Sequence, residues 1–156
     1  MDSGFTQNLT EKMSRDGDMN VRKEAIWAMS NAFYKCNAEQ ARLMVQSQFF
    51  ERSRDALETL KELKIIFVVL EGIMYALQRG KDIPMADGSN PFVIAIQQCD
   101  LYEKLQSLID NHPDTQVCYK TEALFRDYFS SNDADVGVSD DIAAGGNDGS
   151  QPNLTF

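Results

Sequence analysis

Apolar residues recur at helical spacing in three segments of the chain. In the first segment they fall at offsets of 0, 4, 7, 8, 11 and 12: Val21, Ala25, Ala28, Met29, Ala32 and Phe33. The offsets recur 44 residues later at Ile65, Val69, Gly72, Ile73, Ala76 and Leu77, and a further 52 residues later at Val117, Thr121, Leu124, Phe125, Tyr128 and Phe129. Because this spacing places one apolar stripe along a helix, we expect three helices that share one pattern.

Further helices are predicted between these three, over residues 38–48, 56–63, 92–98 and 101–109, and no stretch before residue 130 has the sustained alternation of a strand. Glycines, prolines and an Asn90-Pro91 turn signal predict an inserted loop over residues 79–91. About three helices in each unit of roughly 40 to 47 residues is typical of armadillo or HEAT repeats.

The predicted fold class is therefore all-α, an armadillo-repeat right-handed solenoid of about three repeats. We place the repeats at about residues 15–52, 53–91 and 92–129, within a domain of residues 1–129. An ordinary helical bundle whose spacing agrees by accident is the alternative that periodicity alone leaves open.

Charge divides the chain into two parts. Its 156 residues carry a net charge of −9, and residues 130–156 contribute five aspartates without a single lysine or arginine. With four glycines and few large apolar residues, this segment is predicted to be a disordered acidic tail, with or without a partner. The acidic balance argues against a nucleic-acid partner. Because no apolar run reaches the roughly 18 residues of a membrane span, no membrane partner is expected either.

The sequence offers little to catalysis. Cys36, Cys99 and Cys118 are widely spaced, and His112 is the only histidine, so neither a disulfide framework nor a metal site is expected. No GxSxG, HExxH or phosphate-binding glycine loop is present. The pair His112 and Cys118 is more simply read as a turn histidine and a packed thiol. We expect no enzymatic activity, no cofactor and a reducing, intracellular environment.

A second strip lies on the first repeated helix. Glu24, Trp27 and Asn31 stand at i, i+3 and i+7, within about 60° of one another on a helix. An exposed indole holds the stem and charge of a lysine or arginine. An asparagine amide pairs with both backbone groups of an extended peptide, and a carboxylate pairs with a cation. The strip therefore suits a basic peptide, whereas a purely structural reading packs Trp27 between helices.

The sequence resembles the C-terminal armadillo repeats of importin-α (karyopherin-α), about the eighth to the tenth. Residues 23–32, KEAIWAMSNA, are similar to the family's KEAAWAISNA segment in the eighth repeat, and residues 38–40 to the PEQ that follows it. Residues 64–66 and 69–73 resemble the ninth-repeat KII…ALNGL pattern. Asn90-Pro91-Phe92, Lys104-Leu105 and Tyr128-Phe129 match the tenth repeat, so the resemblance covers roughly residues 15–130.

The resemblance implies a nuclear-import adaptor whose third helices line a groove that binds basic nuclear-localisation-signal peptides of cargo proteins. Trp27, Asn31 and Glu24 take the positions of the family's Trp/Asn ladder in the minor binding site, and Ser30 beside them is a weaker candidate. The last repeats, residues 64–129, would contact an export receptor of the importin-β superfamily. Such a protein shuttles between cytoplasm and nucleus.

Departures from the family pattern limit this reading. The second repeat has Glu71 and Tyr75 at the ladder positions and the third has Ala123 and Asp127, so one rung, meaning one Trp/Asn pair, remains. We expect the importin-β-binding segment and the major-site repeats to be missing, so importin-β is a partner only of a longer product. The alternative function is an armadillo or HEAT scaffold for another protein, with no import role.

Overall fold

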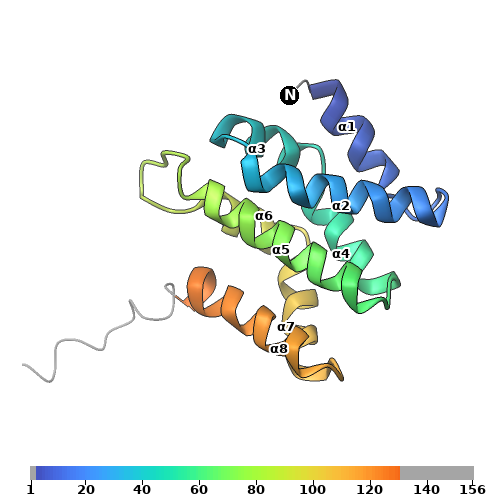
Figure 1. Cartoon of the computed structure of the whole chain (residues 1–156). Coiled ribbons are helices and arrows are strands. Elements are labelled where there is room, and N and C mark those ends of the chain that lie inside the picture. The colour runs from blue at the N-terminus through green and yellow to red at the C-terminus, as the bar shows by residue number, and fades with distance from the viewer. Residues whose placement is uncertain (1–2, 131–156) are drawn as a thin grey trace, which may run out of the picture.

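The computed structural model of the chain describes residues 3–130, which form helices and connecting turns without a strand (Figure 1). The helices in chain order are α1 (Ser3–Lys12), α2 (Met19–Lys35), α3 (Ala38–Gln46), α4 (Phe49–Thr59), α5 (Leu63–Gly80), α6 (Pro91–Gln98), α7 (Leu101–Asn111) and α8 (Thr115–Leu124). A π-helical turn, η1 (Phe125–Phe129), continues α8.

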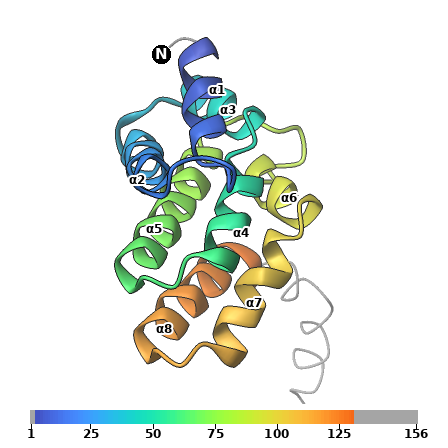
Figure 2. The ribbon, with the colours of Figure 1, turned by 90° about the vertical axis from the view of Figure 1, so that its right-hand side faces the viewer.

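The helices form two layers. α2, α5 and α8 lie side by side along one face, with α2 packed against α5 and α5 against α8 (Figures 1 and 2). α4, α6 and α7 lie behind them, and α1 and α3 close the end next to α2. The fold is an all-α, armadillo-like helical solenoid, as the sequence predicts. Its right-handed sense stays a prediction.

The turns of the backbone repeat with the helices. Gln48, between α3 and α4, has φ +72°, and Asp100, 52 residues later between α6 and α7, has φ +60°. Asp18 and Asp114 precede α2 and α8, and each carboxylate accepts hydrogen bonds from two backbone N–H groups of the first turn. Glu62, at the corresponding place before α5, makes no such bond. The repeat is therefore present in local backbone geometry as well as in apolar spacing.

The predicted apolar stripe of the first repeated helix is wrong in part. α2 buries Arg22, Ala25, Ile26, Met29, Ser30 and Phe33, whereas Val21 is 45% exposed and Ala28 is exposed. The buried face of α2 is rotated relative to the predicted stripe because α2 packs against both α1 and α5. Helical spacing alone does not show which neighbouring helix covers which side of α2. The stripe of α5, by contrast, is buried at every predicted position.

The predicted helix over residues 56–63 is also wrong in its bounds. α4 begins at Phe49, and Phe49, Phe50, Ser53, Ala56 and Leu57 are its buried residues. Charged residues on the outer side of this helix obscured that spacing in the sequence. The inserted loop is found over residues 81–90, as predicted.

The helices fall into one triplet of α3, α4 and α5 and another of α6, α7 and α8, which η1 extends. α1 and α2 form an incomplete group before them. The repeat boundaries at 15–52, 53–91 and 92–129 stay a prediction. The tail predicted to be disordered lies outside the described residues from residue 131 onward.

A tight contact joins the first two long helices. Gly72 of α5 faces Ser30 of α2, and a Cβ atom added to Gly72 would stand 2.5 Å from the Ser30 Oγ atom. Because glycine carries no side chain, the two helices approach closely at this point. Their closeness fixes how α2 is rotated and thereby which of its side chains face solvent.

Candidate peptide-binding face

The exposed side of α2, α5 and α8, called here the third-helix face, carries the predicted strip. The Asp18 carboxylate starts α2 by accepting hydrogen bonds of 2.9 and 3.1 Å from the N–H groups of Asn20 and Val21. The helix then runs unbroken for 17 residues. Glu24 and Asn31 are exposed on it, and Trp27 is half-buried. At i, i+3 and i+7 these three side chains share one side of α2.

Ser30 is not brought to this side. It is 3% exposed, and its Oγ atom points into the contact with Gly72 without a hydrogen-bond partner among the described residues. In the sequence Ser30 lies next to Asn31, but one residue is about 100° of helix rotation. The buried position makes Ser30 a packing residue of the α2–α5 contact.

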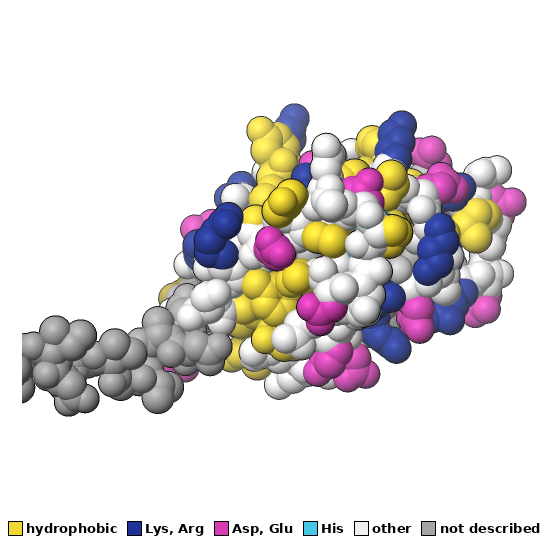
Figure 3. Space-filling view, turned by 90° about the horizontal axis from the view of Figure 1, so that it is seen from below, with side chains coloured by type: hydrophobic (Ala, Val, Ile, Leu, Met, Phe, Trp, Pro, Cys, Tyr) yellow, Lys and Arg dark blue, Asp and Glu magenta, His cyan; other side chains and the backbone are white. Residues whose placement is uncertain are grey.

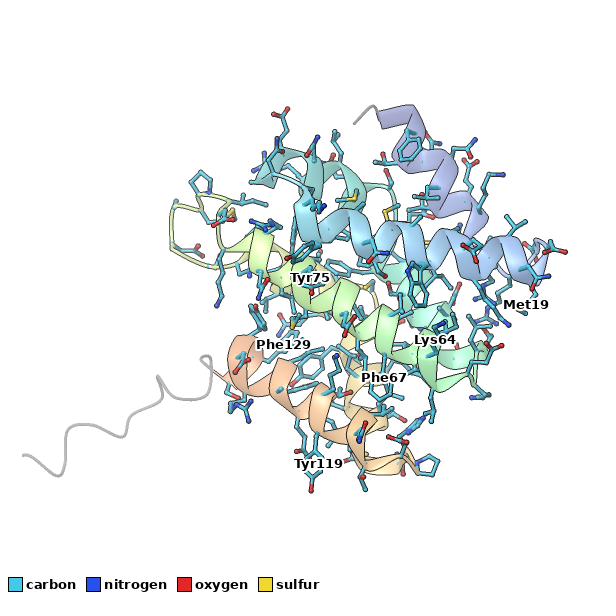
Figure 4. All side chains as sticks on the ribbon, in the orientation of Figure 1. Met19, Lys64, Phe67, Tyr75, Tyr119 and Phe129 are labelled. Atoms are coloured by element: carbon cyan, nitrogen blue, oxygen red, sulfur yellow. The ribbon has the colours of Figure 1, made fainter. Side chains whose placement is uncertain are left out.

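The indole of Trp27 already has a cation over it. The Nζ atom of Lys64, near the start of α5, lies 4.9 Å from the centroid of the Trp27 ring. Figure 4 shows Lys64 on the α5 side of α2. Next to this contact, Lys23 of α2 forms an ion pair with Glu62, the residue before α5. Two lysines therefore link α2 to the start of α5 beside the Trp27 ring: Lys64 from α5 and Lys23 from α2.

The positions that correspond to the strip on α5 are used inside the molecule. Glu71 takes the place of Trp27, and its carboxylate forms an ion pair of 2.7 Å with Lys120 of α8. Tyr75 takes the place of Asn31, and its ring meets the ring of Tyr34 edge to face, with the centroids 5.0 Å apart. Neither residue therefore reproduces the Trp/Asn rung on α5.

The corresponding positions of the third unit are also different in kind. Ala123 offers no ring, and the exposed Asp127 lies 3.4 Å from the Nε atom of Arg126. Close by, the ammonium group of Lys81 lies 4.6 Å from the ring centroid of Tyr128. Burial is the main cause that raises the pKa of Tyr128, and the charge of Asp127 adds to it. Within residues 3–130, Trp27 and Asn31 thus form the one rung of the predicted kind.

Sequence reasoning missed the lysines. Lys64, Lys120 and Lys81 each lie over an aromatic ring of another helical element, namely Trp27, Phe67 and Tyr128. No spacing rule connects residues so far apart in the chain. The lysine in the KII segment, Lys64, was the available signal, because it is the second residue of α5, the helix packed against α2. The third-helix face consequently carries both signs of charge rather than a simple acidic groove.

The residues weighed for catalysis have local structural contacts. The backbone N–H of Asp114 donates a hydrogen bond of 3.1 Å to the Nδ1 atom of His112, and the Cys118 thiol lies 3.4 Å from the His112 carbonyl oxygen. A cleft of about 630 Å³ opens beside this turn, with Leu57, Ile66 and Leu108 among its lining residues. Residues 3–130 contain no cluster of three or more metal-binding side chains. No helix in this range is long and apolar enough to span a membrane.

The fold and this face define a helical-repeat protein of the armadillo-like class. No protein-family model matches the chain. The chain is 26% identical over 102 residues to importin subunit alpha-8 of Arabidopsis thaliana, a stretch that covers 65% of this chain and 23% of the relative. It is 24% identical over 144 residues to importin subunit alpha-5 of Arabidopsis thaliana, which covers 92% of this chain and 27% of the relative.

The chain spans about a quarter of the length of these relatives. The two similarities support an importin-α-like relationship, and they agree with the resemblance found in the sequence. They do not fix which repeats of the family the chain matches.

Proposed function

We propose that the chain is part of an importin-α-like nuclear-import adaptor whose α2 binds basic nuclear-localisation-signal peptides. The observation that carries the proposal is the geometry of one helix side, where the half-buried Trp27 lies between the exposed side chains of Glu24 and Asn31. A half-buried indole is held in place by the core, yet still offers a ring face to a ligand. The arrangement is what recognition of an extended basic peptide requires.

Each of the three side chains has a distinct task in this proposal. Trp27 packs against the methylene stem and the charge of a peptide lysine or arginine, a contact of about 0.5–2 kcal/mol. Asn31 donates to a peptide carbonyl and accepts from a peptide N–H, whatever the peptide side chains are. Glu24 pairs with a second cation. Ser30, buried against Gly72, supports the position of α2.

One rung gives weak binding. Because Glu71 and Tyr75 are engaged with Lys120 and Tyr34, α5 supplies no second pocket of the same kind. We therefore expect a dissociation constant in the high-micromolar range or weaker, which corresponds to less than about 6 kcal/mol of binding free energy. Salt weakens the charged contacts further.

The proposal places the chain at about the eighth to the tenth repeat of an adaptor that shuttles between cytoplasm and nucleus. Residues 64–129 then form the surface for an export receptor of the importin-β superfamily. At the α7–α8 end of the stack, hydrophobic side chains gather between charged groups of both signs (Figure 3). A hollow of about 370 Å³ there is lined in part by Ile109, Phe125 and Arg126, which suits a protein partner. Importin-β joins only if a longer product carries its binding segment.

The second candidate function is an armadillo-type interaction scaffold without an import role. The contact of Lys64 with Trp27 favours it, because the ring is already in use within the chain. In a scaffold this contact would simply hold α2 to α5, and basic peptides would not compete for the ring.

The deciding experiment is a titration of the purified chain into a fluorescein-labelled, Lys/Arg-rich localisation peptide, followed by fluorescence anisotropy. We expect saturable binding that Trp27→Ala weakens by about twofold to thirtyfold, the range that follows from 0.5–2 kcal/mol. Asn31→Ala, which changes an exposed side chain, should weaken binding without loss of stability.

Phe5→Ala is the matched control, because Phe5 is an aromatic residue that is 57% exposed on α1, away from α5. It should leave the affinity unchanged. Absence of binding by a chain whose circular dichroism spectrum shows that it is folded would contradict the adaptor proposal and favour the scaffold.

A further inference from the structure

Three lysines lie over aromatic rings of the third-helix face, and they are held in different ways. Lys120 lies 5.6 Å from the ring centroid of Phe67 and is also fixed by its ion pair with Glu71. Lys64 is exposed, and no salt bridge to it is found among residues 3–130. Lys120 is therefore locked between two helices, whereas the ammonium group of Lys64 is held by the Trp27 ring alone in this range.

The Lys64 ammonium takes the place that a ligand cation needs. It lies 4.9 Å from the Trp27 ring centroid, within the distance of about 6 Å at which a cation is attracted by an aromatic face. A peptide lysine that approached the same ring face would meet a like charge there, and the two ammonium groups repel each other. Peptide binding to that face requires Lys64 to leave it.

We infer that Lys64 is an internal ligand of the Trp27 site, which a peptide lysine displaces on binding. The inference rests on the proposed function, because it concerns the site proposed for basic peptides. The exposed four-carbon stem of Lys64 can turn into solvent without disturbing the core, and Trp27 itself stays in place through its packing on that core. Lys64 thereby lowers the affinity of the site for every basic peptide.

Lys64→Met tests this directly, because it keeps a flexible stem and removes the charge. We expect the labelled basic peptide to bind about twofold to fivefold more tightly to this variant, the factor set by an exposed cation–π contact. Lys81→Met is the matched control. It removes the same charge from a lysine over another ring, that of Tyr128, so a general effect of net charge would appear in both variants.

Nuclear magnetic resonance gives a readout that does not depend on affinity. The ring current of Trp27 should shift the methylene protons of Lys64 upfield in the free chain. Trp27 is the only tryptophan in the sequence, and Trp27→Ala, which removes the aromatic ring, identifies it as the source of the shift. Saturation with peptide should return these signals toward the ordinary lysine values as Lys64 leaves the ring.

The outcomes separate the two claims. If the peptide binds the wild-type chain in a Trp27-dependent way, but Lys64→Met has no effect or Lys81→Met has the same effect, the inference is overturned and the proposed function stands. Lys64 signals that stay shifted at saturation overturn it equally. If neither the wild-type chain nor Lys64→Met binds peptide while both are folded, the proposed function fails and the inference fails with it.

Discussion

Gly72 of α5 and Ser30 of α2 lie so close together that a Cβ atom on Gly72 would stand 2.5 Å from the Ser30 Oγ atom and 3.1 Å from the Ser30 Cα atom. The second distance concerns backbone, so rotation of the serine side chain does not relieve the clash. This contact determines how closely α2 and α5 approach. It also sets the rotation of α2: Asn31, about 100° from Ser30 around the helix, is exposed, and Trp27, about 60° from Ser30, lies half-buried at the edge of the contact.

Gly72→Ala is expected to lower the free energy of unfolding by about 1 kcal/mol. Overpacking costs about 1–3 kcal/mol, and the gain of about 1 kcal/mol from better helix propensity offsets part of it. Urea unfolding followed by circular dichroism measures the change. Gly17→Ala is the control, since no atom lies within 4 Å of the added Cβ there. A Gly72→Ala variant more stable than the wild type would contradict the close contact.

Ser30→Ala should raise the free energy of unfolding by about 0.5 kcal/mol. The Oγ atom is buried without a hydrogen-bond partner among the described residues, so its removal breaks no bond, and alanine is the better helix former. The same denaturation experiment tests it. Peptide affinity should not change, and a loss of affinity at unchanged stability would show that Ser30 contacts the ligand.

Asp114→Ala should destabilise the chain by about 1 kcal/mol, because it removes the side-chain cap of α8. Glu62→Ala, at the corresponding place before α5, removes no cap and only the exposed ion pair with Lys23, which is worth less than about 1 kcal/mol. Thermal melts of both variants at low and high salt compare them. Equal losses that vanish together in salt would argue against the cap.

The buried Cys36 thiol is expected to make the free energy of unfolding fall as the pH rises into the alkaline range. Burial raises the pKa of Cys36, which is 6% exposed, so the folded thiol keeps its proton where the unfolded thiol has lost it. The contribution of the protonated thiol to the free energy of unfolding is complete below the ordinary thiol pKa. It is lost as the pH rises through the raised pKa of Cys36 in the folded chain. Urea midpoints between about pH 7 and about pH 10 should therefore fall less steeply in Cys36→Ala.

Cys99 and Tyr128, whose pKa values burial also raises, remain in the Cys36→Ala variant and contribute to the slope that is left. Identical slopes in the wild type and the variant would contradict the role of the Cys36 thiol.

Much of the fold could be predicted from the sequence because its signals are local. The stripe of α5 and the turn over residues 81–90 follow from spacing and turn residues alone. The buried side of α2 could not be predicted from spacing. The packing of α1 and α5 around this helix leaves Val21 exposed and buries Arg22. The start of α4 at Phe49 was missed because charged residues interrupt its apolar spacing.

The candidate site divides in the same way. Glu24, Trp27 and Asn31 share one helix, so their common side follows from helix geometry. Lys64 reaches Trp27 from the next long helix, and only the packing of α2 on α5 brings the two together. The burial of Ser30 likewise depends on Gly72, a residue far from it in the chain.

The most direct test of the central claim, that the exposed side of α2 binds basic peptides, is a nuclear magnetic resonance titration of the isotope-labelled chain with a Lys/Arg-rich localisation peptide. The single indole N–H signal and the side-chain amide of Asn31 report on the site without ambiguity, and a peptide with glutamine in place of its basic residues is the control. The account predicts saturable shifts of both signals, and of few signals outside α2 and the start of α5. Shifts confined to other helices, or none at saturating peptide, would contradict it.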